Sequence, residues 1–156
     1  MMSLCSEVLS CLQGKTLCTA ESCTGGGIGQ AITAVPGASE VFKGGIISYC
    51  NEVKHNVLGV DADKLSVLGP VSGPVAEEMA AGARKVIGAD VGISVTGLAG
   101  PGGDCCGNPQ GRVFIGYSDR KQTLSRMFTF PGNRDQVRQA AVREALLLII
   151  QLNSAV

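Results

Sequence analysis

Three segments of the sequence combine side chains that can react with backbone that can approach a ligand closely. The first contains Ser22 and the glycine run Gly25–Gly27. The second contains Tyr49 and Lys54, and the third is the glycine-rich run Gly97–Gly103. A serine hydroxyl is a weak nucleophile until a base takes its proton, and a lysine with a lowered pKa is one base that does so. These residue types therefore suggest acyl transfer by a Ser22–Lys54 pair.

The first segment is predicted to join the end of a strand to the start of a helix. The first N–H groups of a helix have no partner within it, so those of Gly25 and Gly26 are expected to hold a phosphate or a developing oxyanion. A structural interpretation, in which Ser22 caps the helix and the glycines permit a tight turn, stays open. The spacing differs from the G-x-S-x-G elbow, so that class of hydrolase is not indicated.

The second segment is predicted to begin a short helix that Asn51 caps and that carries Lys54 in its first turn. The positive end of the helix dipole and partial burial would both lower the pKa of the lysine, as a neutral base requires. The hydroxyl of Tyr49 can orient the lysine or a substrate. The alternative is a solvated lysine paired with Glu52 and a tyrosine that only packs.

The third segment follows a predicted strand that ends with the hydroxyl of Thr96. A glycine-rich loop at a strand end lets the backbone come close to a ligand, although a purely structural loop is the alternative. The run lacks both the lysine of a Walker loop and the spacing of a dinucleotide-binding fingerprint. Cys105 and Cys106 follow it and are interpreted as incidental, because adjacent cysteines rarely bridge without strain.

The elements that must position these segments alternate between strand and helix. Strands are predicted over 15–20, 44–49, 91–96, 111–117 and 124–130, the second of them as a buried strand, and helices over 4–12, 28–35, 51–57, 72–85 and 133–152. This alternation implies an α/β fold, a three-layer α/β/α sandwich with a mixed, mostly parallel sheet of about five strands. Ligands collect at the carboxyl ends of parallel strands, so the three segments are expected to meet at one edge of the sheet.

Composition excludes several classes of protein. The 156 residues are 45% hydrophobic, include 22 glycines and carry 13 basic and 13 acidic side chains, which fits one domain over 1–156 with no net charge. Nucleic acid and membrane surfaces are therefore not expected partners. Seven cysteines without a C-x-x-C pair, together with one histidine, predict neither a metal site nor a disulfide framework, and most of the cysteines are expected to be buried.

The amino-terminal residues lack the basic region and apolar run of a secretory signal, so a cytoplasmic protein is expected. The low share of charged residues, 17%, favours a homo-oligomer.

Three blocks of the sequence resemble the signature blocks of the CinA carboxy-terminal domain family. They span 19–26, 49–54 and 96–103, in the order and spacing of the family, and 132–138 resembles the start of its last helix. Cys50 and the segment 104–110 depart from the residues that the family commonly has there.

The resemblance implies a serine amidohydrolase that converts nicotinamide mononucleotide to nicotinate mononucleotide and ammonia without a metal or organic cofactor. It also implies the stand-alone form, without the amino-terminal nucleotide pyrophosphatase-like domain of longer members. Ser22 is then the nucleophile and Lys54 its general base, with Tyr49 and Thr96 assisting. Arg134 is an alternative to Arg138 as the ligand of the 5′-phosphate. The residues expected to bind the substrate nucleotide are Thr24, Gly25, Gly26, Gly100, Gly102, Gly103 and Arg138.

Two other interpretations stay open. A CinA-like domain that binds nucleotides without turning them over would keep the same glycine loops. Alternatively, the thiol of Cys23 and not the hydroxyl of Ser22 is the nucleophile, in which case thiol alkylation would abolish activity.

Overall fold

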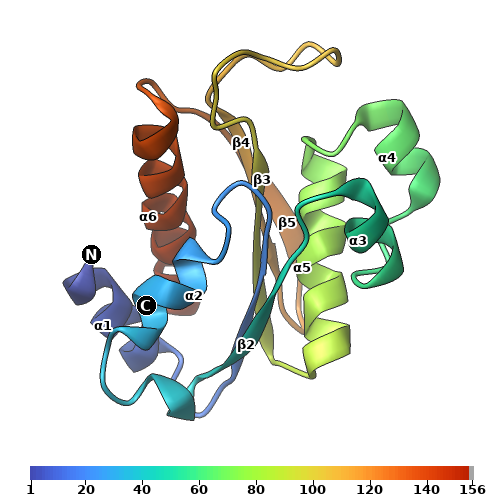
Figure 1. The fold of residues 1–156 in the computed structure, drawn as a ribbon. Coiled ribbons are helices and arrows are strands. Elements are labelled where there is room, and N and C mark those ends of the chain that lie inside the picture. Colours follow the sequence, from blue (N-terminus) through green and yellow to red (C-terminus); the bar gives the residue numbers. More distant parts are fainter. Residues whose placement is uncertain (155–156) are drawn as a thin grey trace.

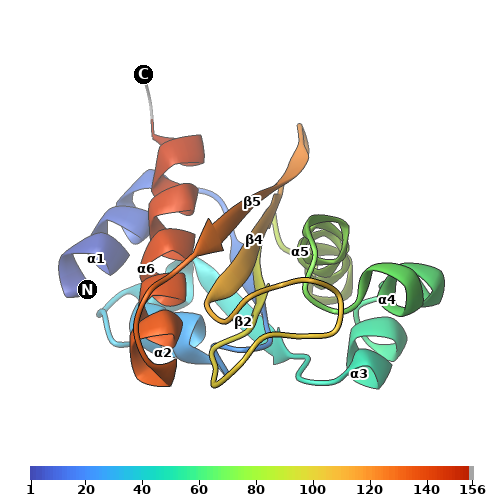
Figure 2. The ribbon, with the colours of Figure 1, turned by 90° about the horizontal axis from the view of Figure 1, so that it is seen from above.

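The computed structural model describes residues 1–154 and contains one mixed sheet between two layers of helices (Figures 1 and 2). The strands lie in the order β2-β1-β3-β4-β5. β1 pairs in parallel with β2 and β3, whereas β4 is antiparallel to both of its neighbours. Four of the five strands therefore run in the same direction, which confirms the predicted mixed, mostly parallel sheet. The strands are β1 (Leu17–Glu21), β2 (Phe42–Ile47), β3 (Val91–Gly97), β4 (Arg112–Ser118) and β5 (Thr123–Thr129).

Helices cover both faces of the sheet, which makes the three-layer sandwich that the sequence predicts. Figure 1 shows α1, α2 and α6 on one face and α3, α4 and α5 on the other. Within residues 1–154, no helix is both long and apolar enough to cross a membrane. The helices are α1 (Met2–Cys11), α2 (Gly27–Thr33), α3 (Asn51–Asn56), α4 (Ala62–Leu68), α5 (Gly73–Ile87) and α6 (Arg134–Asn153), with a short 3-10 helix over Ala38–Glu40.

A hydrophobic core fills the space on each side of the sheet. The interior strand β1 is buried over its whole length and sends alternate side chains to opposite faces. Leu17 joins the core under α1, α2 and α6, whereas Cys18 and Ala20 join the core under α5. Because both cores hold β1 in place, the loop that follows it begins from a fixed point.

Helix α6 begins with the capping box that the sequence predicts. The side chain of Asn133 accepts from the N–H of Gln136, whose own side chain accepts from the N–H of Asn133. This cap fixes the first turn of α6, which contains Arg134 and is followed one turn later by Arg138.

Two expectations about the fold and its core are wrong, and one helix was not predicted. Strand β2 is an edge strand in which half-buried and exposed residues alternate, because it has only one neighbouring strand, whereas 44–49 was predicted as a buried strand. Only Cys5, Cys18 and Cys23 of the seven cysteines are buried. Helix α4 was not predicted, although Asp61 caps it by accepting from the N–H of Asp63.

Helix α5 contains a glycine at the point where another segment crosses it. A Cβ on Gly82 would overlap the carbonyl oxygen of Leu58, which follows α3. Since the N–H of Val60 donates to the carbonyl of Lys54 at 3.0 Å, this crossing also fixes the segment that carries the lysine.

We therefore expect Gly82→Ala to lower the free energy of unfolding by about 1–3 kcal/mol, because the new methyl group meets backbone that cannot rotate away. Helix propensity alone predicts the opposite, a gain of up to ~1 kcal/mol. Urea unfolding measures the difference, with the exposed Lys85→Ala in the same helix as control, expected within ~0.5 kcal/mol of the native protein. A Gly82→Ala protein as stable as the native one would contradict this account of the crossing.

Candidate active site

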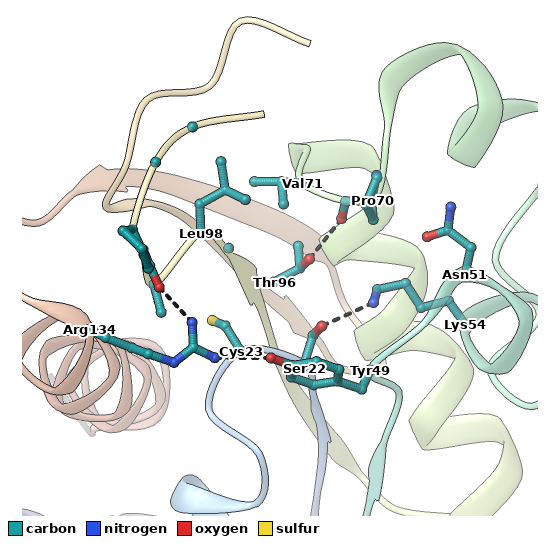
Figure 3. Close-up of a pocket in the computed structure, with 16 residues that line it drawn as sticks. Ser22, Cys23, Tyr49, Asn51, Lys54, Pro70, Val71, Thr96, Leu98 and Arg134 are labelled. Carbon is teal, nitrogen blue, oxygen red and sulfur yellow. Dashed lines mark hydrogen bonds between the residues drawn. The ribbon is translucent and has the colours of Figure 1, made fainter. Parts of the chain in front are cut away.

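The three chemistry-bearing segments meet at one edge of the sheet, around a cavity of about 300 Å³ (Figure 3). This volume lies at the lower end of the range of roughly 300–1,000 Å³ for small-molecule sites. Seven of the predicted site residues line it, namely Ser22, Tyr49, Lys54, Thr96, Gly100, Gly102 and Gly103. The other residues that line it are Cys23, Asn51, Pro70, Val71, Gly97, Leu98, Ala99, Pro101 and Arg134.

Ser22 and Lys54 are in direct contact. The Nζ atom of Lys54 lies 3.0 Å from the Oγ of Ser22 and donates to the carbonyl oxygen of Ser48 at 2.7 Å. Lys54 is 1% exposed, and no carboxylate lies within ion-pair distance of it in the described part of the chain. Burial therefore lowers the pKa of Lys54 to about 8. A substantial fraction of this amine is neutral near physiological pH, which is the state a general base needs.

The cause of this lowered pKa is burial, not the helix dipole that the sequence analysis also invoked. Helix α3 has Cys50 at its N-cap position, and Asn51, the predicted cap, is its first residue. Lys54 then falls in the last turn of this short helix, where the dipole does not lower the pKa of an amine. The alternative of a solvated lysine paired with Glu52 is not what the structure shows.

The loop after β1 is held by a carboxylate that the sequence analysis passed over. Glu21 is 2% exposed and accepts from the hydroxyl of Thr24 at 2.7 Å and from the N–H groups of Ile28 and Gly29 at 2.9 and 3.1 Å. It thereby joins the strand end to the start of α2 and fixes the turn that contains Ser22. The sequence did contain a signal for this role of Glu21. It is an acid at the end of a predicted strand, directly before the serine and a glycine-rich helix start.

The backbone of this turn differs from the expectation at one point. The N–H of Gly25 was expected to be free, but it donates to the carbonyl of Ser22 at 3.0 Å. For the N–H groups of Cys23 and Gly26, the structure of residues 1–154 shows no acceptor. Only Cys23 of these residues lines the cavity, so its N–H is the better-placed donor for an anion.

Thr24, Gly25, Gly26 and Arg138 do not line the cavity. The hydroxyl of Thr24 is bonded to Glu21, as described above. Arg138 donates to the carbonyl oxygens of Cys23 and Thr24 at 3.0 and 3.3 Å, so it supports the loop from the side of α6.

Arg134 lines the cavity instead. Its guanidinium donates to the carbonyl oxygen of Gly100 at 2.7 Å and to the hydroxyl of Tyr49 at 3.1 Å (Figure 3). Tyr49 was expected to orient Lys54 or a substrate, and its hydroxyl pairs with Arg134, not with Lys54. Its side chain is 62% exposed, so the ring stands at the rim of the cavity.

The third wall of the cavity is the loop between β3 and β4. The hydroxyl of Thr96 donates to the carbonyl of Pro70 at 2.7 Å, which joins the end of β3 to the start of α5. The N–H of Gly102 donates to Oε1 of Gln110 at 2.9 Å and so is already used. The N–H groups of Gly100 and Gly103 have no acceptor within the chain as far as Ser154.

Cys23 shares the cavity with Ser22, but its surroundings do not activate it. The thiol is 6% exposed, and burial raises its pKa to about 11, so it stays protonated at neutral pH. The described residues also contain no group of three or more His, Cys, Asp or Glu side chains that could hold a metal ion.

The burial of Lys54 predicts how stability depends on pH. Between the folded pKa of about 8 and the ordinary value of 10.5, the unfolded chain binds a proton that the native protein does not, so stability rises with pH across that window. Below pH 8 the lysine is charged in the native protein as well, so the burial of its ammonium lowers the free energy of unfolding by the full amount. Lys54→Met removes this cost and should raise the free energy of unfolding at pH 7 by on the order of 1–3 kcal/mol.

The gain should fade between pH 8 and 10.5, which urea unfolding at pH 7 and pH 10 measures. The exposed Lys85→Met is the matched control and should show no such change with pH. An equal gain for Lys54→Met at both pH values would mean that the lysine is not buried in its charged form at pH 7.

Comparison with known proteins identifies the family. The model of the CinA C-terminal domain family matches residues 2–153. The chain is 45% identical to a CinA-like protein of Thermosynechococcus vestitus over 138 residues, which is 86% of this chain and 33% of the relative. It is 48% identical to a CinA-like protein of Parasynechococcus marenigrum over 148 residues, 92% of this chain and 35% of the relative. The chain thus spans about a third of the length of these curated relatives.

Solved structures agree with this assignment along almost the whole chain. The competence damage-inducible protein A of Klebsiella pneumoniae has a TM-score of 0.93 and 37% identity, with 96% of this chain and 94% of that chain covered. The competence or damage-inducible protein of Enterobacter asburiae has a TM-score of 0.95 and 33% identity, with 98% of both chains covered. With both its sequence and its fold matched in this way, the chain belongs to the CinA C-terminal domain family.

Proposed function

We propose that this protein is a serine amidohydrolase that converts nicotinamide mononucleotide to nicotinate mononucleotide and ammonia. The observation that carries the proposal is the 3.0 Å contact between Ser22 Oγ and the buried Nζ of Lys54, whose pKa is lowered to about 8. A serine beside an amine that can be neutral at physiological pH is the arrangement that Ser-Lys acyl transfer requires. The alternative nucleophile, Cys23, is disfavoured by its raised pKa.

The reaction begins when neutral Lys54 takes the proton of Ser22. The Ser22 oxygen then attacks the carboxamide carbon, and the N–H of Cys23 stabilises the resulting oxyanion. Lys54 returns the proton to the leaving nitrogen, the C–N bond breaks and ammonia departs, which leaves an ester on Ser22. Water attacks this ester with Lys54 again as base, which releases the carboxylic acid and restores the hydroxyl of Ser22.

Other residues that line the cavity suit the amide and the nucleotide. The hydroxyl of Thr96 donates to Pro70 and so presents its oxygen as an acceptor for the carboxamide NH₂. The ring of Tyr49 at the rim can pack against the pyridine ring. The guanidinium of Arg134 and the N–H groups of Gly100 and Gly103 are the donors available to the 5′-phosphate.

Ammonia release from nicotinamide mononucleotide tests the proposal. We expect the native protein to release ammonia at a rate that rises with pH through about 8, because only neutral Lys54 can act as base. Ser22→Ala should lower kcat by a factor of about 10³ or more, since no other nucleophile replaces the hydroxyl. Cys23→Ala is the matched control and should keep its activity.

Two results would contradict the proposal. Activity that survives Ser22→Ala would rule out the serine as nucleophile. Saturable binding of the nucleotide without any ammonia would instead support a domain that binds but does not react.

A second experiment separates the two arginines. Arg134→Gln should raise KM for nicotinamide mononucleotide about 10–100-fold, because it removes a charged hydrogen bond to the phosphate. The same variant should leave KM for nicotinamide riboside, which has no phosphate, nearly unchanged. Arg138→Gln should lower the melting temperature, because it frees two loop carbonyls, and change KM little. A rise in KM seen only for Arg138→Gln would show that Arg138, and not Arg134, binds the phosphate.

A further inference from the structure

Ser48 carries a buried hydroxyl with no partner. Its side chain is fully buried, and its Oγ forms no hydrogen bond with any of the residues that the structure describes. The backbone of the same residue is well held, since its N–H donates to the carbonyl of Glu21 at 2.7 Å and its carbonyl accepts from Lys54 Nζ at 2.7 Å. Buried polar groups are nearly always bonded, so an exception beside the reactive pair calls for an explanation.

One N–H of Lys54 lacks an acceptor within residues 1–154, and this costs most when the lysine is charged. An ammonium has three N–H donors, and the structure provides two acceptors for Lys54 Nζ, the oxygen of Ser22 and the carbonyl of Ser48. When the proton of Ser22 moves to Lys54, it moves along the existing contact between them, so one N–H of the amine has no acceptor among the described residues either before or after the transfer. After the transfer this N–H belongs to a cation. A buried charge is tolerated only when its hydrogen-bonding groups are satisfied.

Two kinds of neighbouring polar group are poorly suited to accept this bond. The titratable groups whose charges act on it are the thiols of Cys50 and Cys23, and a thiol is a weak acceptor. The carboxylate of Glu21, on the neighbouring strand, already accepts from three donors. Ser48 Oγ, by contrast, is buried without a partner in the described part of the chain and belongs to the residue whose carbonyl Lys54 already contacts.

We propose that Ser48 is a positioning residue whose hydroxyl, after rotation about its Cα–Cβ bond, accepts the third hydrogen bond of Lys54 when that lysine is protonated. Ser48 exchanges no proton, because it only accepts a hydrogen bond from Lys54, and Lys54 itself carries the protons of the proposed reaction. The catalytic consequence rests on the proposed function. The effect on the charged form of the lysine does not, so the two can be tested separately.

The direct test follows the titration of Lys54 by NMR in protein labelled with ¹³C at the lysine Cε. Lys54→Met identifies the signal. Ser48→Ala should lower the pKa of Lys54, making the ammonium about tenfold more acidic, and Ser48→Thr, which keeps a hydroxyl, should restore the native value. The matched control is Ser94→Ala, which removes another fully buried serine hydroxyl, one that donates to the carbonyl of Ala76. It should leave the titration unchanged.

The kinetic test measures covalent labelling of Ser22 by a sulfonyl fluoride across pH, together with ammonia release from nicotinamide mononucleotide. With Ser48→Ala, both rates should begin to rise at lower pH, because the lysine loses its proton earlier. Their plateaus should fall about tenfold, because the charged intermediate is less stable, and KM should be unchanged.

A Ser48→Ala protein with native Lys54 titration and native labelling, and with a higher melting temperature, would overturn the proposal, because the hydroxyl would then only be an unfavourable buried group. If Ser48→Ala fails to fold, Ser48→Cys keeps the side-chain volume and is expected to lower the pKa of Lys54 to a smaller extent. If the native protein is labelled at Ser22 but releases no ammonia, the substrate assignment fails, and the titration still decides the role of Ser48.

Discussion

The candidate active site depends on one unfavourable arrangement, the burial of a lysine amine without a counter-ion. A fully buried lysine lowers the stability of the fold at neutral pH, so the chain must hold it there by other means. Gly82 lets the segment after α3 cross α5 closely, and the carbonyl of Lys54 is bonded within that segment. The neutral amine beside Ser22 is thus obtained through packing. A carboxylate partner would have kept the lysine charged and unable to act as a base.

The charged residues around the site divide into those that build it and those that face the ligand. Glu21 and Arg138 use their hydrogen bonds on the loop after β1 and are unavailable to a substrate. Arg134 lies on the cavity side of the same layer of helices. This division explains how a protein of zero formal charge can offer one localised positive group to an anion.

Much of the fold and the core of the site could be predicted from the sequence, because strand patterns, glycine runs and helix caps are local signals. The meeting of Ser22 with Lys54 followed from the rule that carboxyl ends of parallel strands share an edge. The pairing of Tyr49 with Arg134 could not be predicted, since it joins segments 85 residues apart through a specific side-chain geometry. Likewise, the edge position of β2 depends on strand order, which no local pattern encodes.

The position of Arg134 has a consequence for the proposed turnover. In the free protein its guanidinium already bridges Gly100 and Tyr49, so an arriving anion exchanges these contacts for its own and gains only the difference. In the proposed reaction the phosphate of the mononucleotide is the same before and after deamidation, so a site that bound it without competition would also retain the product. In that reaction, Arg134 would return to Gly100 and Tyr49 when the product leaves, so release would not create an unpaired charge.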